Sequence, residues 1–406
     1  MNIPLSRPDI GDLEVEYVTR TLRSGNLSLG PQVAEFEEEF ANYIGTRYAV
    51  ATNSGTSALH LCVRALGIGP EDEVLTTSFS FVASANCLLY ERALPMFVDI
   101  HPVTLNINPA EIRETLTSEY VWKPDKCRLV NRRSGRILKA ILPVHVFGTP
   151  CDMAPIVEMA REFNLRILED ACEALGSRYR GQLVGTFGDA AAFAFYPNKQ
   201  MTTAEGGMIV TNDTQVAMLC RSLRNQGRDD RSAWLRHTAL GYNYRLSDLH
   251  CALGLVQLKR ISDLLSSRER VADEYSRALA HTPGITLPYE PAETKQSWFV
   301  YVIQLQGPWA AWRRESLIAN LRGRGIACQA YFPAIHRQPY FKKIPLSRPS
   351  SLPQTDLAAG RCLALPFFSA MTNAQVAEVC AAVHELLTES ADAAGSCQKQ
   401  FSASAG

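Results

Sequence analysis

Beginning at Tyr48, the chain alternates short apolar runs with longer stretches whose apolar residues recur at helical spacing. YAVAT (48–52) is followed by SALHLCVRAL, EVLTT (73–77) is followed by FVASANCLLYER, and the rhythm continues as far as RILED (166–170). Strands that alternate with helices of about 10 to 15 residues indicate a mostly parallel sheet with helices on both faces. The fold class is therefore α/β, and a ligand is expected at the carboxyl ends of the strands.

Helical patterns lie on both sides of this region. Amphipathic stretches over 12–23 and 32–44 predict two helices in an N-terminal arm. Past Gly241 the pattern changes to a long helix over 246–279, a β-like run (SWFVYVIQL), another helix and a closing helix near 373–388. We expect two domains: the arm and a large cofactor-binding domain over 1–250, and a smaller α+β domain over 251–389.

Two segments depart from the pattern. Residues 118–136 carry six basic residues and a predicted hairpin, in which CRLV and RILK flank the turn NRRSG. We interpret them as a surface insertion whose basic side chains either face solvent or contact a substrate phosphate or a partner subunit, and a role in specificity is a hypothesis. The tail 390–406 is small and polar, so we expect it to be disordered.

Charge and composition narrow the classes of function. Lys plus Arg and Asp plus Glu number 41 each, which argues against nucleic acid or an acidic membrane as a general partner. The sequence contains no run of about 18 apolar residues, so no membrane span is expected. Eleven cysteines occur without a C-x-x-C pair, which favours reduced thiols in the cytoplasm over disulfides or a metal site.

The most informative candidates lie between residues 167 and 213. Asp170 closes an apolar strand, and Lys199 follows 29 residues later, between FAFYP and a Gly-containing turn. A lysine among apolar neighbours is partly desolvated, which favours its neutral, nucleophilic amine. Schiff-base chemistry with pyridoxal phosphate needs such an amine and a carboxylate against the pyridine nitrogen, for which Asp170 is the candidate. Taken alone, both residues also fit an ordinary surface position.

A phosphate site is expected where the strand YAVAT enters the next helix through NSGTS. Gly55 permits close backbone approach, Thr56 adds a hydroxyl, and the free amides of the helix start favour a phosphate, although an ordinary capped helix fits the same residues. Phe81 follows the next strand, where its ring either stacks on a flat cofactor or belongs to the core.

Together these segments resemble the DegT/DnrJ/EryC1/StrS family of nucleotide-sugar aminotransferases, which are pyridoxal phosphate enzymes of fold type I. The resemblance runs from Ile3 to about Leu387. Its motifs include NSGTSALHL, TTSFSFVASAN, LEDACEALGSRY, VGTFGDAAAFAFYPNK, EGGMIVTND and LGYNYRLSDLHCALGLVQL.

The resemblance implies a role for each matching residue. Lys199 would form the Schiff base with pyridoxal phosphate and then move protons as general acid and base. Asp170 would pair with the pyridine nitrogen, and Phe81 would stack on the ring. Gly55 and Thr56 would hold the phosphate.

Four further positions follow from the same resemblance. Asn243, in GYNYR, matches an asparagine that reaches the phosphate from the neighbouring subunit, which implies a homodimer with two shared active sites. Glu173 stands near the ring oxygen in place of the usual Gln or His, so it needs a proton or a cationic partner. Ala194 replaces a serine whose hydroxyl often meets the phosphate. Ala204 replaces a glycine, so we expect the loop to adjust and avoid positive φ.

Weaker candidates concern the substrate. His336, in YFPAIHRQPYF, matches a family segment near the sugar nucleotide. Three arginines are candidate partners for a diphosphate: Arg224, Arg228 and Arg245.

Other suggestive residues have ordinary interpretations. His145 lies in an apolar run and is interpreted as a core histidine with satisfied hydrogen bonds. GIGP (67–70) and GTFG (185–188) lack the G-x-G-x-x-G pattern, so no nicotinamide site is expected.

The resemblance implies an aminotransferase that converts a keto sugar linked to a nucleoside diphosphate into an amino sugar, with glutamate as the expected donor, in surface polysaccharide or related glycan synthesis. Two alternatives stay open. One is a sugar dehydratase of the same family, although its members replace the catalytic lysine. The other is a cofactor-binding regulatory protein without turnover. The sugar, the nucleotide and the position aminated are not encoded in these motifs.

Overall fold

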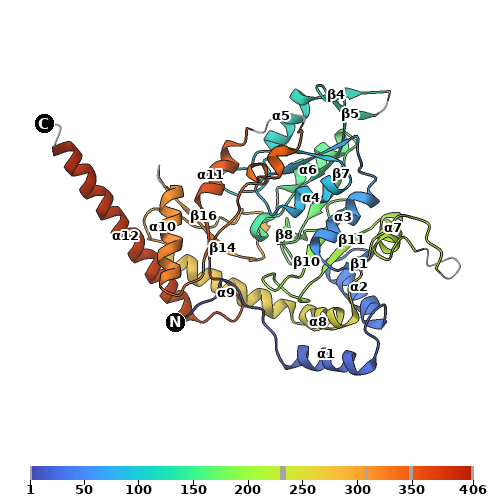
Figure 1. The fold of residues 1–406 in the computed structure, drawn as a ribbon, viewed down its shortest axis with the longest axis horizontal. Coiled ribbons are helices and arrows are strands. Elements are labelled where there is room, and N and C mark those ends of the chain that lie inside the picture. The colour runs from blue at the N-terminus through green and yellow to red at the C-terminus, as the bar shows by residue number, and fades with distance from the viewer. Residues whose placement is uncertain (1, 126, 229–234, 308–309, 347–350, 404–406) are drawn as a thin grey trace.

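The computed structural model describes residues 2–125, 127–228, 235–307, 310–346 and 351–403, with side chains described as far as residue 388. A mixed sheet forms its centre, with β11 alone reversed among the strands of the main path (Figure 1). The predicted mostly parallel α/β sheet is therefore confirmed. In spatial order the strands are β1 (Tyr48–Thr52), β11 (Gly207–Thr211), β10 (Ala190–Ala194), β7 (Arg166–Asp170), β6 (Ile137–Leu142), β2 (Asp72–Thr77) and β3 (Leu94–Val98).

Helices cover both faces of this sheet (Figure 1). The pleat alternates the side chains of β10, so that Ala192 packs with the helices of one face and Phe193 with those of the other. One face carries α3 (Gly55–Ala65), α4 (Ala83–Tyr90) and α7 (Thr214–Arg224). The other carries α2 (Pro31–Ile44), α5 (Pro109–Glu119), α6 (Met153–Glu162) and α8 (Asp248–Lys259), with α1 (Asp12–Ser24) against α8.

A second, antiparallel sheet forms the core of the small domain. Its strands are β12 (Ile285–Thr286), β14 (Tyr301–Leu305), β16 (Cys362–Leu365) and β15 (Gln329–Ala330), in that spatial order. Its helices are α9 (Ile261–Leu279), α10 (Ala310–Gly323), α11 (Pro353–Arg361) and α12 (Asn373–Ala403). A three-stranded sheet of β8 (Arg178–Tyr179), β9 (Gln182–Leu183) and β13 (Thr294–Lys295) joins the two domains. Single turns of 3-10 helix occur at η1 (Val146–Gly148), η2 (Ile335–Arg337) and η3 (Phe341–Lys343).

The domain limits differ from those expected in two places. The helix predicted over 246–279 is divided at Arg260, whose guanidinium binds Asp9 at 2.8 Å and Glu14 at 2.6 Å. Because α8 packs on α1 and α2, the boundary placed at 250 falls inside a helix of the large domain. At the other end of the chain, Ile3 is buried in the core of the small domain rather than in an arm of the large one.

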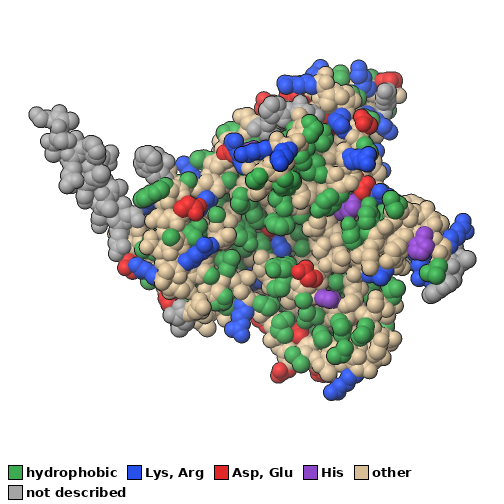
Figure 2. Space-filling model, in the orientation of Figure 1, with side chains coloured by type: hydrophobic (Ala, Val, Ile, Leu, Met, Phe, Trp, Pro, Cys, Tyr) green, Lys and Arg blue, Asp and Glu red, His purple; other side chains and the backbone are tan. Residues whose placement is uncertain are grey.

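The predicted hairpin of the insertion forms, but it is more than a surface feature. β4 (Tyr120–Lys123) and β5 (Arg128–Asn131) pair with each other, and β5 pairs with the first residues of β6. Tyr120 is buried and donates to Glu73 at 2.6 Å. Basic side chains gather over this end of the molecule (Figure 2). The insertion lies at the amino ends of β2 and β6. Within one subunit it is therefore remote from the carboxyl ends of the strands, where a ligand is expected. Residue 126 of the insertion lies outside the described residues.

The closing helix is longer than expected. α12 continues to Ala403 and projects from the rest of the molecule (Figure 1). Alanine and glutamine in ADAAGSCQKQF favour helix, which the polar composition alone did not reveal. The disorder expected over 390–406 stays a prediction, and 404–406 lie outside the described residues.

Glu37 joins three elements of the large domain. This buried carboxylate accepts the Ala51 amide at 3.0 Å and pairs with Arg224 and, at 3.3 Å, with Arg221. It therefore ties α2 to β1 and α7.

We expect Glu37→Ala to lower the free energy of unfolding by about 3 kcal/mol, because it leaves the mostly buried Arg224, the partly exposed Arg221 and the Ala51 amide without their shared acceptor. Thermal or urea unfolding measures the change. Glu38→Ala, on the exposed side of the same helix, is the matched control. Equal stability of the two variants would contradict a structural role for the ion pair.

Candidate active site

A cavity of about 520 Å³ opens at the carboxyl ends of β7 and β10, between the two domains. The large domain supplies the start of α3, the start of α4 and the segment after β10, and the small domain supplies aromatic rings. Six residues predicted to bind a cofactor line this one cavity: Gly55, Thr56, Phe81, Asp170, Glu173 and Lys199.

The strand pleat separates the acid pair at the end of β7. Asp170 faces the cavity, where its carboxylate accepts Ser84 Oγ at 2.6 Å and the Cys172 amide at 3.2 Å. Glu169 is fully buried elsewhere and accepts three amides of the segment 185–188 at 2.7 to 2.8 Å. Its carboxylate also lies 3.1 Å from His145 Nε2, and His145 Nδ1 accepts the Cys151 amide at 3.0 Å. The interpretation of His145 as a satisfied core histidine is thus confirmed.

The Lys199 amine lies between an aromatic ring and a carboxylate. Nζ is 3.8 Å from the centroid of Phe299 and 3.6 Å from Glu173 Oε1, and the Lys199 side chain is 13% exposed. The second oxygen of Glu173 accepts the Phe147 amide at 3.0 Å. Burial raises the pKa of Glu173, while the charge of Lys199 and the Phe147 amide act in the opposite direction. The cationic partner that a carboxylate at 173 was expected to need is Lys199 itself.

The start of α3 presents free backbone amides at the edge of the cavity. Ser54 caps the helix by accepting the Ser57 amide at 3.1 Å, which leaves the Gly55 and Thr56 amides without an acceptor inside the helix. A Cβ at Gly55 would lie 2.6 Å from that of Ala194 and 3.0 Å from Cys172 Sγ. Glycine is required because β10 passes so close, and the turn can hold a phosphate.

The two alanine substitutions have different consequences. Ala194 lines the cavity without a hydroxyl, as expected. The expectation that Ala204 avoids positive φ is wrong, because its φ is 66°. Hydrogen bonds fix the turn in that conformation: the Ala204 amide donates to Thr202 Oγ1 at 2.9 Å, and Thr203 Oγ1 donates to the Glu205 carbonyl at 2.7 Å.

The rim and the small domain complete the cavity. Phe81 is 59% exposed, so it is not a core residue, and it lies where it can cover a flat ligand. Ser84, Phe299, Tyr331 and Phe332 were missed from the sequence. Helical spacing from Phe81 could have revealed Ser84. Tyr331 and Phe332 begin YFPAIHRQPYF, the segment that the resemblance places near the sugar nucleotide, whereas no local pattern near Phe299 signals the cavity.

The candidates for substrate contact lie outside the cavity lining. Arg224 pairs with Glu37 and donates to the Ala51 carbonyl at 2.7 Å, so it has structural partners within its own chain; its role as a diphosphate partner stays a prediction. Arg245 donates to Asn225 at 2.9 Å and to Gln226 at 2.8 Å.

Three other candidates are also placed outside it. His336 Nδ1 is 2.7 Å from Ser78 Oγ and its Nε2 is 3.2 Å from Asp356. Arg228 bridges to His237 through its backbone. Asn243 is exposed, on a segment supported by the stacked rings of Tyr242 and Tyr244, 4.8 Å apart.

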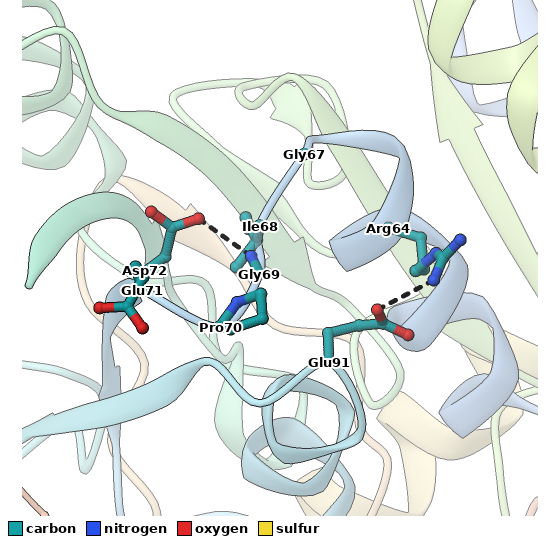
Figure 3. Close-up of a pocket in the computed structure, with 8 residues that line it drawn as sticks. All are labelled: Arg64, Gly67, Ile68, Gly69, Pro70, Glu71, Asp72 and Glu91. Atoms are coloured by element: carbon teal, nitrogen blue, oxygen red, sulfur yellow. Dashed lines mark hydrogen bonds and ion pairs between the residues drawn. The ribbon is translucent and has the colours of Figure 1, made fainter.

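A second hollow, of about 530 Å³, includes the GIGP segment (Figure 3). It lies beyond the carboxyl end of α3, where Asp72 accepts the Gly69 amide at 2.9 Å and Arg64 pairs with Glu91 at 3.1 Å. A helix carboxyl end and three lining carboxylates disfavour a diphosphate, so this hollow does not fit a dinucleotide.

The described residues contain neither a candidate membrane span nor a candidate metal site. Over the described residues, no helix combines the length and apolar character needed to cross a membrane. The same part of the chain contains no group of three His, Cys, Asp or Glu side chains placed to hold a metal ion.

The chain is similar to known proteins over nearly its whole length. Among curated proteins, the chain is 36% identical over 396 residues to the spore coat polysaccharide biosynthesis protein SpsC of Bacillus subtilis, covering 95% of this chain and 97% of that one. It is 36% identical over 388 residues to the GDP-perosamine synthase of Caulobacter vibrioides, covering 95% and 98%.

The chain is also similar to solved structures over nearly its whole length. S. venezuelae DesV, in complex with a ketimine intermediate, is 32% identical with a TM-score of 0.82 and coverage of 95% and 98%. DesI, in the presence of its TDP-sugar product, is 28% identical with a TM-score of 0.84 and coverage of 98% and 96%. The model of the DegT/DnrJ/EryC1/StrS aminotransferase family matches residues 8–384. The family and the fold type inferred from the sequence are confirmed, and the chain belongs to the DegT/DnrJ/EryC1/StrS aminotransferase family.

Proposed function

We propose that the protein uses pyridoxal phosphate to transfer the amino group of glutamate to a keto sugar linked to a nucleoside diphosphate, for surface polysaccharide or a related glycan. One observation carries the proposal: the Lys199 amine, the Asp170 carboxylate and the amides at the start of α3 all meet in a single cavity. These are the three groups that an aldehyde, a pyridine nitrogen and a phosphate on one flat molecule require. The named activity of the GDP-perosamine synthases and the TDP-sugar product of DesI support a nucleotide sugar as substrate.

The chain's own groups divide the work of such a reaction. Pyridoxal phosphate, when bound, would supply an electron sink to the carbon that loses its proton. Lys199 Nζ would anchor the cofactor and, once displaced, carry that proton between neighbouring atoms. Asp170, oriented by Ser84 and the Cys172 amide, would stabilise positive charge on the pyridine nitrogen. Glu173, which lies close to Lys199, would contact the oxygen on the pyridine ring of the cofactor.

The other groups bind and shield the reacting atoms. The amides of Gly55 and Thr56, with the Thr56 hydroxyl, would hold the phosphate. Phe81 would cover one side of the ring, and the aromatic rings of the small domain would exclude water from the cavity.

The partner subunit completes this proposal. Asn243 is exposed and does not line the cavity of its own chain, which suits a residue that serves the neighbouring site of a homodimer. Its supporting rings are themselves held: Tyr242 Oη donates to Glu91 at 3.0 Å, and Tyr244 Oη is 3.2 Å from His60.

A screen of glutamate with nucleotide 3-keto and 4-keto sugars, read by mass spectrometry, tests the proposal. We expect an amino sugar and 2-oxoglutarate to form together, and initial-rate lines to run parallel, because the donor's product leaves before the sugar reacts. Lys199→Ala should reduce the rate on the order of 10³-fold or more, because the proton carrier is lost. Lys259→Ala is the matched control, since its Nζ lies near Tyr17, outside the cavity.

Three results would contradict the proposal. Intersecting rate lines would exclude the two-stage transfer. A bound cofactor that no amino donor alters would favour the regulatory alternative, and loss of a sugar hydroxyl without amino transfer would favour the dehydratase.

The raised pKa of Glu173 predicts how the stability of the apoprotein depends on pH. A carboxyl that holds its proton more tightly in the folded state stabilises the fold below its unfolded pKa, and this contribution is lost as the pH rises through the folded pKa. In the apoprotein, the melting temperature of the unmodified chain should therefore fall relative to Glu173→Gln as pH rises from about 5 to about 8. Differential scanning calorimetry measures both proteins, and a difference that is constant or grows with pH would disprove the assignment.

A further inference from the structure

Arg268 of α9 is a buried cation directly behind the active-site lysine. Its side chain is only 2% exposed, and no carboxylate lies within ion-pair distance of it among the described residues. Burial lowers the pKa of Arg268 to about 10, against the opposing charge of Asp9, so the guanidinium stays protonated at neutral pH. Removing such a charge from water is costly, and hydrogen bonds must compensate it.

Those hydrogen bonds go to two segments about 100 residues apart in the chain. Nη2 donates to the carbonyls of Lys199 at 2.7 Å and Asn198 at 3.4 Å. Nη1 donates to the carbonyls of Phe299 at 3.2 Å and Trp298 at 3.3 Å.

The same two segments define where the active-site amine lies. Lys199 carries the amine, and the Phe299 ring lies 3.8 Å from its Nζ. One side chain therefore fixes both the backbone from which the amine extends and the ring against which it rests. The planar fork of an arginine can reach two pairs of carbonyls at once, which the single ammonium of a lysine cannot do.

We propose that Arg268 is a positioning residue, which holds the backbones of Lys199 and Phe299 together and so fixes the Lys199 amine in the cavity. It also couples α9 of the small domain to the lysine of the large domain. Its value to the reaction rests on the proposed function of Lys199, but the geometric role does not depend on any cofactor.

The reactivity of the Lys199 amine in full-length apoprotein tests this role. Trace acetylation with acetic anhydride, followed by peptide mass spectrometry, gives the rate at Lys199 relative to Lys259 in the same sample. We expect Arg268→Lys and Arg268→Gln each to raise that ratio about fivefold or more. A fivefold change in rate corresponds to the free energy of about one net hydrogen bond. Arg270→Lys is the control: it lies on the same helix and donates to the Met371 carbonyl at 2.8 Å, and it should leave the ratio unchanged.

Each other outcome overturns the proposal. An unchanged ratio with a lower melting temperature would make Arg268 purely structural, and a change in Arg268→Gln alone would assign the effect to charge. If neither variant is soluble, hydrogen–deuterium exchange on the unmodified apoprotein decides. If Arg268 holds the Lys199 backbone in place, the amides of segment 196–201 should exchange as slowly as those of α9 around Arg268. Faster exchange in segment 196–201 would contradict the proposal. Because no sugar or cofactor is used, failure here leaves the proposed reaction standing, and failure of the sugar screen leaves this result intact.

Discussion

An amine from the segment after β10 and a carboxylate from the end of β7 must share one partly buried cavity without neutralising each other, and the architecture is arranged around that requirement. Asp170 is fixed at the end of β7 by Ser84 and a backbone amide, while Lys199 is directed toward Phe299 and Glu173. Three acids and one cation are among the residues that line this cavity: Asp170, Glu173, Glu205 and Lys199. An anionic ligand therefore depends on the backbone amides at the start of α3, which provide positive potential without a positive side chain.

Charged side chains are tolerated in and behind this buried site because backbone amides and carbonyls form hydrogen bonds with most of them. Glu169 and Asp170 are adjacent in sequence, yet the pleat gives one a structural place among amides and leaves the other facing the cavity. Arg268 shows the complementary arrangement, in which a buried cation is surrounded by carbonyls. Fixed dipoles of this kind need no rearrangement during a reaction, which is the property that electrostatic catalysis exploits.

Local patterns in the sequence predicted the sheet of the large domain and singled out several residues that line the cavity. Alternating apolar runs predicted the parallel sheet, and Asp170 and Gly55 were found because a strand end and a glycine turn leave local marks. The rest depends on contacts between distant segments. Nothing near Arg224 signals Glu37, and nothing near Phe299 signals the cavity. Arg260, where the predicted long helix is divided, pairs with carboxylates about 250 residues away in the sequence. The positive φ of Ala204 was missed because hydrogen bonds with neighbouring threonines, accepted by Thr202 and donated by Thr203, outweigh the preference of the residue itself.

The central claim is that the amine at position 199 anchors the cofactor, and borohydride reduction tests it most directly. Protein loaded with pyridoxal phosphate is reduced, digested and mapped by mass spectrometry. The account predicts one phosphopyridoxyl group per chain, on the peptide that contains Lys199. A label on another lysine, such as Lys139 or Lys295, or no stable label at all, would contradict it.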